Sequence, residues 1–311
     1  MNSKEFKGVI IEIISGICYG AMGVLGVFLM KYGFDFISIT MMMFLSLVIF
    51  NLLKILFTDI SMFRISREYL VIVAFQGIVV INGLRLAYFY ALNYLPAGIC
   101  SIILFCMVFP LMYVSYIFFN EEITGKKITC SLVAVFGVAL ALNIFSQSGT
   151  GNIKGIIAMV LCVAFSVFNN ALNRYYINTK LKTSTITFYF SLFGFFTLLT
   201  YQTIFEKSQS LFIIISNNVG AGEFLLILIL FSIVCIGAVI LLMYGLNYVS
   251  ATHMGVCQAF DPISATMLGV VLFKDVFTLY QIIGIISIIL SVSFMSFNIK
   301  IGSIKKGGCY E

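Results

Sequence analysis

The sequence has 311 residues, of which 61% are hydrophobic and only 10% are Asp, Glu, Lys or Arg. A soluble globular domain carries roughly 25% charged residues, so most of the outer surface of this chain must face lipid instead of water. The formal net charge of +6 is not gathered in a basic block, which gives no indication of nucleic-acid binding. The composition therefore excludes an ordinary soluble enzyme and predicts a polytopic membrane protein.

The eight cysteines and the single histidine, His253, do not form the pattern of a metal site. Most of the cysteines lie inside apolar runs, where cysteine behaves as a small hydrophobic residue, and none has Cys-x-x-Cys spacing. We therefore expect no disulfide framework, no metal and no cofactor. The chain also lacks a Gly-x-Ser-x-Gly elbow and a phosphate-binding loop, so it is not expected to be an enzyme.

Ten apolar runs are long enough to cross a bilayer as helices. A hydrocarbon core of about 30 Å requires about 20 residues of helix, and short charged or Gly- and Asn-containing connections separate the runs. The predicted spans are 8–30, 36–57, 69–92, 97–119, 128–146, 154–175, 184–205, 223–245, 250–273 and 277–299. Between the seventh and eighth spans, the apolar stretch 211–215 is too short to cross and is predicted to lie at the membrane interface.

Lysine and arginine are distributed unequally between the two sides of these spans. With the N-terminus in the cytoplasm, thirteen of the eighteen bases lie on the inner side and four on the outer side, while Arg85 lies within a span. The positive-inside rule therefore predicts a protein of the cytoplasmic membrane with both termini cytoplasmic. The first span follows Lys4 and Lys7 as a signal peptide would, but its length and the spans behind it indicate that it is retained.

The chain contains an internal repeat. Residues 90–97, Tyr-Ala-Leu-Asn-Tyr-Leu-Pro-Ala, recur at 244–251 as Tyr-Gly-Leu-Asn-Tyr-Val-Ser-Ala. A proline inside the next span and an acid at its end follow each copy in the same order: Pro110 and Glu122, then Pro262 and Asp275. The ordered series recurs at about half the chain length, which indicates two related halves.

Each half holds five predicted spans, and because five is odd the second half must enter the membrane from the opposite side. The predicted fold is an all-α membrane protein of ten transmembrane helices in two inverted five-helix repeats, 1–147 and 148–311. Inverted repeats enclose a site near the bilayer midplane that opens to either side in turn, which is the architecture of secondary transporters.

Several motifs resemble the EamA-type, ten-helix members of the drug/metabolite transporter superfamily. These motifs are Gly16-Ile17-Cys18-Tyr19-Gly20, the run from Ala91 through Pro110 to Glu121-Glu122-Ile123-Thr124, and Asp261-Pro262 followed by Asp275 and Gly284. The chain departs from the family pattern in having no Trp, and Ser131 stands where the family often has glycine. The resemblance covers essentially the whole chain and implies a secondary carrier of small metabolites, amino acids or drugs, frequently an exporter.

Charges deep in a span are costly and usually face the protein interior or a water-filled cavity, and three residues are candidates for such a position: Glu12, Arg85 and Asp261. Pro262 lacks a backbone donor, so the carbonyl of Gln258 is expected to lose its helical partner beside Asp261. Arg85 has polar residues at helical spacings and is predicted to bind a substrate carboxylate or to pair with Asp261. The alternatives are a packing contact for Asp261 and an interfacial position for Arg85 and Glu12.

Aromatic and amide side chains complete the predicted substrate site: Tyr19, Tyr88, Tyr244, Asn169 and Asn170. The tyrosines fall in spans that line the cavity in the resembled fold. The asparagines either bond to substrate or link two helices. Glycines recur along the first span and are expected to allow close helix packing, with a flexible gate as the alternative: Gly16, Gly20, Gly23 and Gly26.

The predicted function is secondary transport by alternating access. The expected cargo is a small metabolite such as an amino acid or related zwitterion, and the expected direction is export. Arg85 and Asp261 would bind opposite ends of the solute, and protonation of Asp261 or Glu12 would couple transport to the proton gradient. An organic cation or drug held by aromatics and an acid is the alternative cargo. A membrane-embedded enzyme that uses Glu12, Asp261 and His253, or a non-transporting sensor, are the other classes. The expected partners are the substrate and lipid, with a monomer or homodimer as the assembly.

Overall fold

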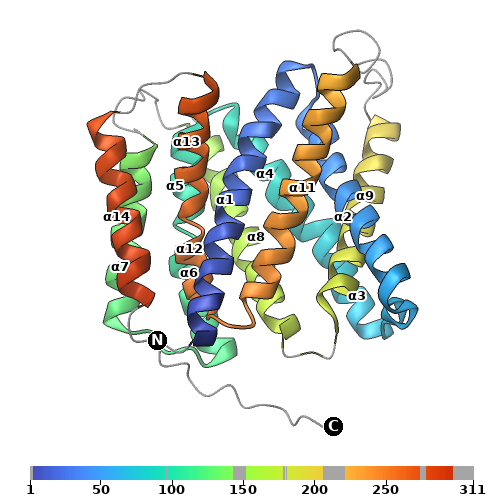
Figure 1. Ribbon diagram of the computed structural model, residues 1–311, viewed down its shortest axis with the longest axis horizontal. Helices are drawn as coiled ribbons and strands as arrows, with labels where there is room; N and C mark the ends of the chain where they lie inside the picture. Colours follow the sequence, from blue (N-terminus) through green and yellow to red (C-terminus); the bar gives the residue numbers. More distant parts are fainter. Residues whose placement is uncertain are drawn as a thin grey trace.

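The computed structural model describes residues 3–95, 97–142, 152–177, 179, 181–205, 221–273 and 278–296. All regular secondary structure within these ranges is helical, and the long helices run side by side in alternating directions (Figure 1). The apolar composition explains this architecture, because in a bilayer only helices or closed barrels satisfy every backbone polar group internally.

The first half of the chain forms five spans. Its elements are α1 (Ser3–Lys31), α2 (Phe36–Thr58), the short 3₁₀-helix η1 (Ile60–Phe63), α3 (Arg67–Phe75), the π-helical turn η2 (Gln76–Ile81), α4 (Asn82–Leu92), α5 (Ala97–Phe105), α6 (Val108–Phe119) and α7 (Gly125–Ala141). The third span consists of α3, η2 and α4, and the fourth consists of α5 and α6. Asp35 and Thr124 cap the N-termini of α2 and α7 with their side-chain oxygens.

The second half repeats this plan. Its elements are α8 (Ile153–Ile177), α9 (Thr183–Phe205), α11 (Ala221–Gly245), α12 (Ala251–Cys257), α13 (Phe260–Phe273) and α14 (Leu279–Ser296). Seven segments in the described part of the chain are long and apolar enough to cross a membrane, and α7, the α12–α13 pair and α14 complete ten spans. The predicted fold of ten helices in two inverted five-helix repeats is confirmed. Three predicted features lie outside the described residues: Asp275, the stretch 211–215 and the boundary at 147–148.

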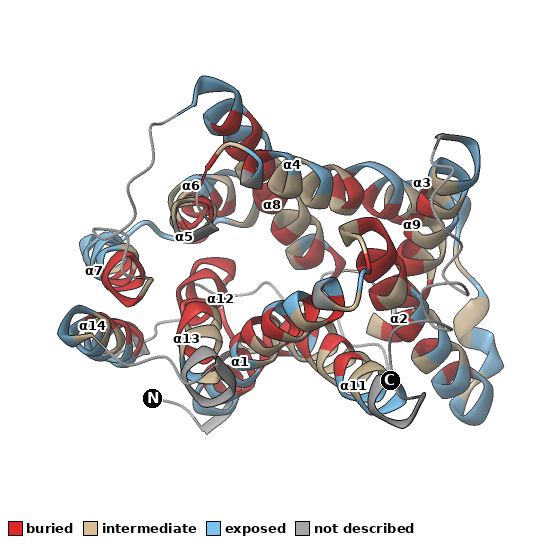
Figure 2. Cartoon of the chain, turned by 90° about the horizontal axis from the view of Figure 1, so that it is seen from above, coloured by how far each residue is buried: buried red, intermediate tan, exposed pale blue. Residues whose placement is uncertain are grey.

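The two repeats exchange contacts across the bundle. The first span of each repeat packs against the third and fourth spans of the other, so α1 contacts α11 and α13 while α8 contacts α4, α5 and α6. The remaining spans pair with their counterparts, α2 with α9 and α7 with α14. Seen from above, the α7–α14 pair lies at one edge of the bundle, away from α2 and α9 (Figure 2). This exchange of contacts is what a pseudo-two-fold axis in the membrane plane requires.

The repeated Tyr-Asn motif folds in the same way in both halves. The tyrosine hydroxyls four residues apart are paired in each copy: Tyr90 with Tyr94 at 3.3 Å and Tyr244 with Tyr248 at 3.0 Å. The amide of Asn93 donates to two carbonyls of the last turn of α4, and the amide of Asn247 does the same for α11. These bonds satisfy carbonyls that a helix end leaves without a partner, so each motif ends its span.

The fourth span of each repeat is interrupted just before its proline. The helix stops at Phe105 and resumes at Val108 in the first repeat, and it stops at Cys257 and resumes at Phe260 in the second. Pro262 cannot donate to the carbonyl of Gln258, but the N–H of Asp261 donates to that carbonyl at 3.0 Å. The Gln258 carbonyl therefore loses its α-helical partner, as expected, and a 3₁₀-type hydrogen bond from Asp261 replaces it.

Two of the four glycines of α1 bring it close to the interrupted span. A Cβ atom on Gly20 would collide with the carbonyl oxygen of Asp261 and the hydroxyl of Ser264. A Cβ on Gly16 would lie 3.1 Å from the carbonyl oxygen of Cys257, whereas nothing lies within 4 Å of such an atom on Gly23. Close helix packing therefore explains Gly16 and Gly20, which face α12 and α13, but it does not explain Gly23.

Candidate functional site

Arg85 lies on α4, one turn after the π-helical turn η2, and reaches into the middle of the bundle. Its Nη2 donates to the Sδ of Met43 on α2 at 3.5 Å. The guanidinium also interacts electrostatically with Tyr19 on α1, Cys235 on α11 and Asp261 on α13. Single π-helical turns are rare and occur often at functional sites. Arg85 is therefore surrounded by helices of both repeats and does not extend toward the lipid.

Asp261 is the first charged residue after the interruption between α12 and α13. Its side chain is half-buried, and no hydrogen bond to its carboxylate comes from the part of the chain that the structure describes. Among the described residues, no ion pair within 4.0 Å joins Asp261 to Arg85. The two opposite charges therefore interact at a distance without touching, and both side chains are half-buried.

Two tyrosines accompany these charges. Tyr19 on α1 and Tyr88 on α4 are half-buried, and each interacts electrostatically with Asp261. The hydroxyl of Tyr88 also lies 3.3 Å from the Ser101 hydroxyl on α5. Tyr19, Arg85, Tyr88 and Asp261 thus form a group, here called the charged cluster, to which spans of both repeats contribute. Such a group combines one cation, one anion and two hydroxyls.

Glu12 lies apart from solvent between α1, α11 and α12. The residue is fully buried, and neither carboxylate oxygen has a hydrogen-bond partner within the described part of the chain. A Cβ atom on Gly245 would collide with this carboxyl group, so the glycine provides the space that the group occupies. Gln258 lies beside Glu12, but its Nε2 also lacks a hydrogen-bond partner. An ionised carboxylate in such surroundings is strongly disfavoured, which indicates the neutral acid in this conformation.

Three of the predicted site residues lie away from the charged cluster. Tyr244 is 43% exposed near the end of α11, and its hydroxyl accepts from Tyr248, whose ring lies under the ammonium of Lys7. Asn169 accepts from the Nε2 of Gln76 at 3.0 Å, and Asn170 contacts the Sδ of Met107 at 3.6 Å. The structure does not bring these three residues into the charged cluster.

The sequence analysis did not single out an ion pair between the two repeats. The Nε of Arg174, in the last turn of α8, lies 3.3 Å from Oε1 of Glu121, and both side chains are nearly buried. The same oxygen accepts from the backbone N–H of Ala251 at 3.1 Å, at the start of α12. Both residues lie at predicted span ends, where charges are common, so hydropathy gave no signal for them. The motif Glu121-Glu122-Ile123-Thr124 was the one available indication.

A second ion pair lies on the same end of the bundle, outside the membrane spans. The Nζ of Lys182 lies 3.3 Å from Oδ2 of Asp59, and both side chains are largely exposed. The hydroxyl and the backbone N–H of Ser61 donate to the Asp59 carboxylate at 2.6 and 2.9 Å. These hydrogen bonds, with a smaller contribution from Lys182, hold the pKa of Asp59 below its usual value.

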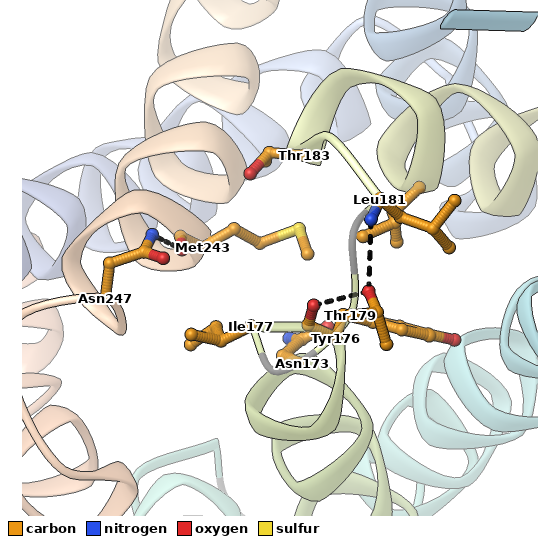
Figure 3. Close-up of a pocket in the computed structure, with 9 residues that line it drawn as sticks. Asn173, Tyr176, Ile177, Thr179, Leu181, Thr183, Met243 and Asn247 are labelled. Atoms are coloured by element: carbon orange, nitrogen blue, oxygen red, sulfur yellow. Dashed lines mark hydrogen bonds between the residues drawn. The ribbon is translucent and has the colours of Figure 1, made fainter. Parts of the chain in front are cut away.

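Two cavities open near these groups, although neither is lined by Arg85 or Asp261. A cavity of about 150 Å³ lies between the end of α8, the start of α9 and the end of α11, with Asn173, Thr183 and Met243 around it (Figure 3). A groove of about 560 Å³ lies between α4 and α8 and is mostly apolar, with Lys154 in its wall. The first cavity therefore reaches the polar side of α8 at the end that holds Glu121 and Arg174.

The comparisons with known proteins agree with this architecture. The sequence model of the EamA-like transporter family matches residues 6–143 and again residues 153–297. The chain belongs to this family, a family of transporters and not of enzymes. No curated protein matches the chain. A solved structure titled "Crystal structure of protein" is 17% identical, covers 93% of this chain and 96% of its own, and superposes with a TM-score of 0.76, which shows a shared fold.

Proposed function

We propose that this protein exports a small zwitterionic metabolite, such as an amino acid or a related compound, by alternating access. The observation that carries the proposal is the charged cluster, in which Arg85 and Asp261 come from different repeats, interact electrostatically and remain unpaired. A carboxylate of the solute would bind the planar guanidinium of Arg85, and its ammonium group would bind Asp261. Tyr19 and Tyr88 would contact the body of the solute.

The cost of charges inside the membrane makes the separation of Arg85 and Asp261 informative about the charge of the cargo. A charge deep in a span is expensive, so intramembrane charges usually pair with one another or serve a solute. Arg85 and Asp261 do not pair directly, and each side chain is half-buried. A zwitterion placed between them would neutralise both charges at once. Net-charged cargo would leave one of the two charges without a partner, which favours a zwitterion over an anion.

The asymmetric distribution of bases supports a cytoplasmic position for the end of the bundle that carries Lys7. We place the protein in the cytoplasmic membrane with both termini inside, as a monomer or homodimer, and with the repeats divided at 147–148. The substrate site would then alternate between the cytoplasm and the outside by rocking of one repeat against the other.

Glu12 is the proposed carrier of a coupling proton, with Asp261 as the second carboxyl group. Neither oxygen of Glu12 has a hydrogen-bond partner among the residues that the structure describes, so charging the carboxyl group requires a rearrangement that brings water or a donor to it. Uptake of a proton from one side and release to the other would link its charge to the transport cycle. A Glu12→Gln protein should still bind cargo but lose acceleration of flux by an imposed pH gradient in proteoliposomes.

The substrate assignment is tested by binding of radiolabelled zwitterionic amino acids to purified protein in detergent. Arg85→Gln and Asp261→Asn should each weaken binding by about 10- to 100-fold, because each removes one charge-assisted bond. Cys235→Ser, next to the same arginine, is the matched control and should bind as the native protein does. Unchanged binding in both charge variants would refute the site.

An organic cation is the second candidate, favoured by the two tyrosines beside Asp261. Tetraphenylphosphonium is the probe for it. Binding that survives Arg85→Gln but is lost in Asp261→Asn would assign the site to cations. Binding of amino acids that depends on both charges would assign it to zwitterions.

A further inference from the structure

One face of α8 carries a continuous line of polar side chains. Ser166, Asn169, Asn170, Asn173 and Arg174 recur at spacings of three and one, which places them on one side of the helix. All five are buried or half-buried, whereas the opposite side of the same helix exposes large apolar side chains to the lipid, such as Leu161 and Phe168. The polar face of α8 is defined here by these five residues.

The first repeat currently occupies the hydrogen-bonding groups of this face. The Nε2 of Gln76 donates to Asn169 at 3.0 Å and to Asn173 at 2.9 Å, so η2 is tied to α8 at two points. The Ser166 hydroxyl donates to the Sδ of Met107 at 2.6 Å, between α5 and α6. The Oε1 of Gln76 is buried and has no hydrogen-bond partner among the described residues. A buried polar atom without a partner costs free energy, so an arrangement that gives this oxygen a donor would be better for Gln76 than the present one.

The ion pair of Glu121 and Arg174 closes the end of this face. The Glu121 carboxylate binds Arg174 and also accepts from the N–H of Ala251, which fixes the start of α12. Nη1 of Arg174 donates to the carbonyls of Leu246 at 2.8 Å and Val249 at 3.4 Å, in the connection between α11 and α12. Three separate segments therefore meet at one buried ion pair.

The cavity of about 150 Å³ lies immediately beside this ion pair. Asn173, one residue before Arg174, lines it together with Met243 and Asn247 of α11 (Figure 3). The cavity thus reaches the polar face of α8 from the end that holds Lys7, and it meets that face at Asn173, which also binds Gln76.

The matching face of α1 has no comparable polar line. Gly8 packs on Tyr248 and Val249 as Gly155 packs on Tyr94 and Leu95, which aligns α1 with α8 at an offset of 147. At this offset the five polar residues of α8 correspond to Tyr19, Met22, Gly23, Gly26 and Val27. The polar face is therefore a property of the second repeat alone and is not required by the shared fold.

We propose that the polar face of α8 is the inner access path for cargo and that the Glu121–Arg174 ion pair is the gate that closes it. That cargo uses this path rests on the proposed function, whereas opening and closing at the ion pair does not depend on which cargo is carried. When the pair separates, the start of α12 and the connection after α11 are released together. Asn169 and Asn173 then form hydrogen bonds with water or cargo in place of Gln76.

The gate is tested by modification of Asn170→Cys in inverted membrane vesicles with a membrane-impermeant methanethiosulfonate, read at residue 170 by peptide mass spectrometry. Residue 170 lies on the polar face and is 5% exposed in the closed arrangement. Adding Glu121→Gln preserves an oxygen acceptor for Ala251 but removes the charge that attracts Arg174. We expect modification to become faster by about tenfold, because weakening one state shifts the population toward the other.

Glu122→Gln is the matched control, since Glu122 is the next residue, is exposed and forms no ion pair with any described residue. It should leave the modification rate unchanged. Arg174→Lys keeps the charge but loses the fork that binds two carbonyls, and it provides a second gate variant if Glu121→Gln protein unfolds. Equal rates in Glu122→Gln and in both gate variants would overturn the gate. Faster modification without amino-acid binding at the charged cluster would instead overturn the proposed function alone.

Discussion

The two repeats have the same backbone but different charges. Both third spans end in a Tyr-Asn motif with paired hydroxyls. Both fourth spans break before a proline, where a 3₁₀-type hydrogen bond to the residue three positions earlier replaces the α-helical bond that the proline cannot donate. These features are duplicated because each repeat must end and bend its helices at the same places to build one half of the bundle.

The intramembrane charges are not duplicated. At the offsets that align the repeats, each of the three charged residues corresponds to an apolar residue in the opposite repeat: Arg85 to Val239, Asp261 to Phe109 and Glu12 to Met159. A bilayer penalises each buried charge, so a charge persists only where a particular neighbour or solute compensates it. The symmetry of the two repeats therefore accounts for the fold, and the departures from symmetry coincide with the residues of the proposed site.

The largest effect is expected where α1 crosses the interrupted span more closely than α8 crosses its counterpart. The position that matches Gly20 in α8 is occupied by Val167, which is 7% exposed and accommodated. Gly20→Val should destabilise the protein by about 3 kcal/mol, because the new side chain collides with the backbone of Asp261. Thermal unfolding in detergent measures it. Gly23→Val, with open space around it, should not lower the melting temperature, and equal losses in the two variants would contradict the comparison.

A second way to test the asymmetry is to remove the side chain at each of two symmetry-related positions. Arg85→Ala should reduce amino-acid binding by about 10- to 100-fold, since a charge-assisted contact is lost. Val239→Ala, at the matching position of α11, should change binding by less than about threefold. Equilibrium binding of a radiolabelled amino acid measures both. Similar losses in the two variants would mean that the two positions contribute equally and that the charge carries no special role.

A smaller effect is expected from making the two Tyr-Asn motifs more alike. Ala91 in the first motif corresponds to Gly245 in the second, where a Cβ would meet the Glu12 carboxyl. Gly245→Ala should therefore lower stability by about 1 to 2 kcal/mol, and adding Glu12→Ala should recover most of that loss. A double-mutant cycle of unfolding free energies gives the coupling. Strictly additive losses would show that the glycine does not serve Glu12.

The smallest effect concerns the exposed ion pair that joins α2 of one repeat to the start of α9 in the other. Because the pKa of Asp59 is lower in the folded protein than in the unfolded chain, its contribution to stability is present above the unfolded pKa of about 3.9. That contribution is lost as the pH falls through the folded pKa. The melting temperature of the native protein should fall slightly more than that of Asp59→Asn between about pH 5 and pH 3. Parallel pH profiles would exclude a role for this pair.

Much of the fold follows from local features of the sequence. Apolar runs of about 20 residues predict the spans because the bilayer sets their length, and the recurring Tyr-Asn and proline positions predict the repeat. Asp261 and Arg85 were identifiable because few charges lie deep in any span. The π-helical turn 76–81 was not identifiable, since its residues are apolar and compatible with an ordinary helix.

The roles of the polar residues depend on contacts between distant parts of the chain. Asn169 was predicted either to bind substrate or to link two helices, and in this conformation it accepts a hydrogen bond from Gln76, 93 positions earlier in the sequence. Glu121 and Arg174 look like ordinary interfacial charges until the two repeats are packed together. The sequence by itself determined where the chain crosses the membrane and which charges are costly, because hydropathy and charge are properties of single residues. Only the tertiary structure decided which of those groups meet, because that depends on how ten helices pack.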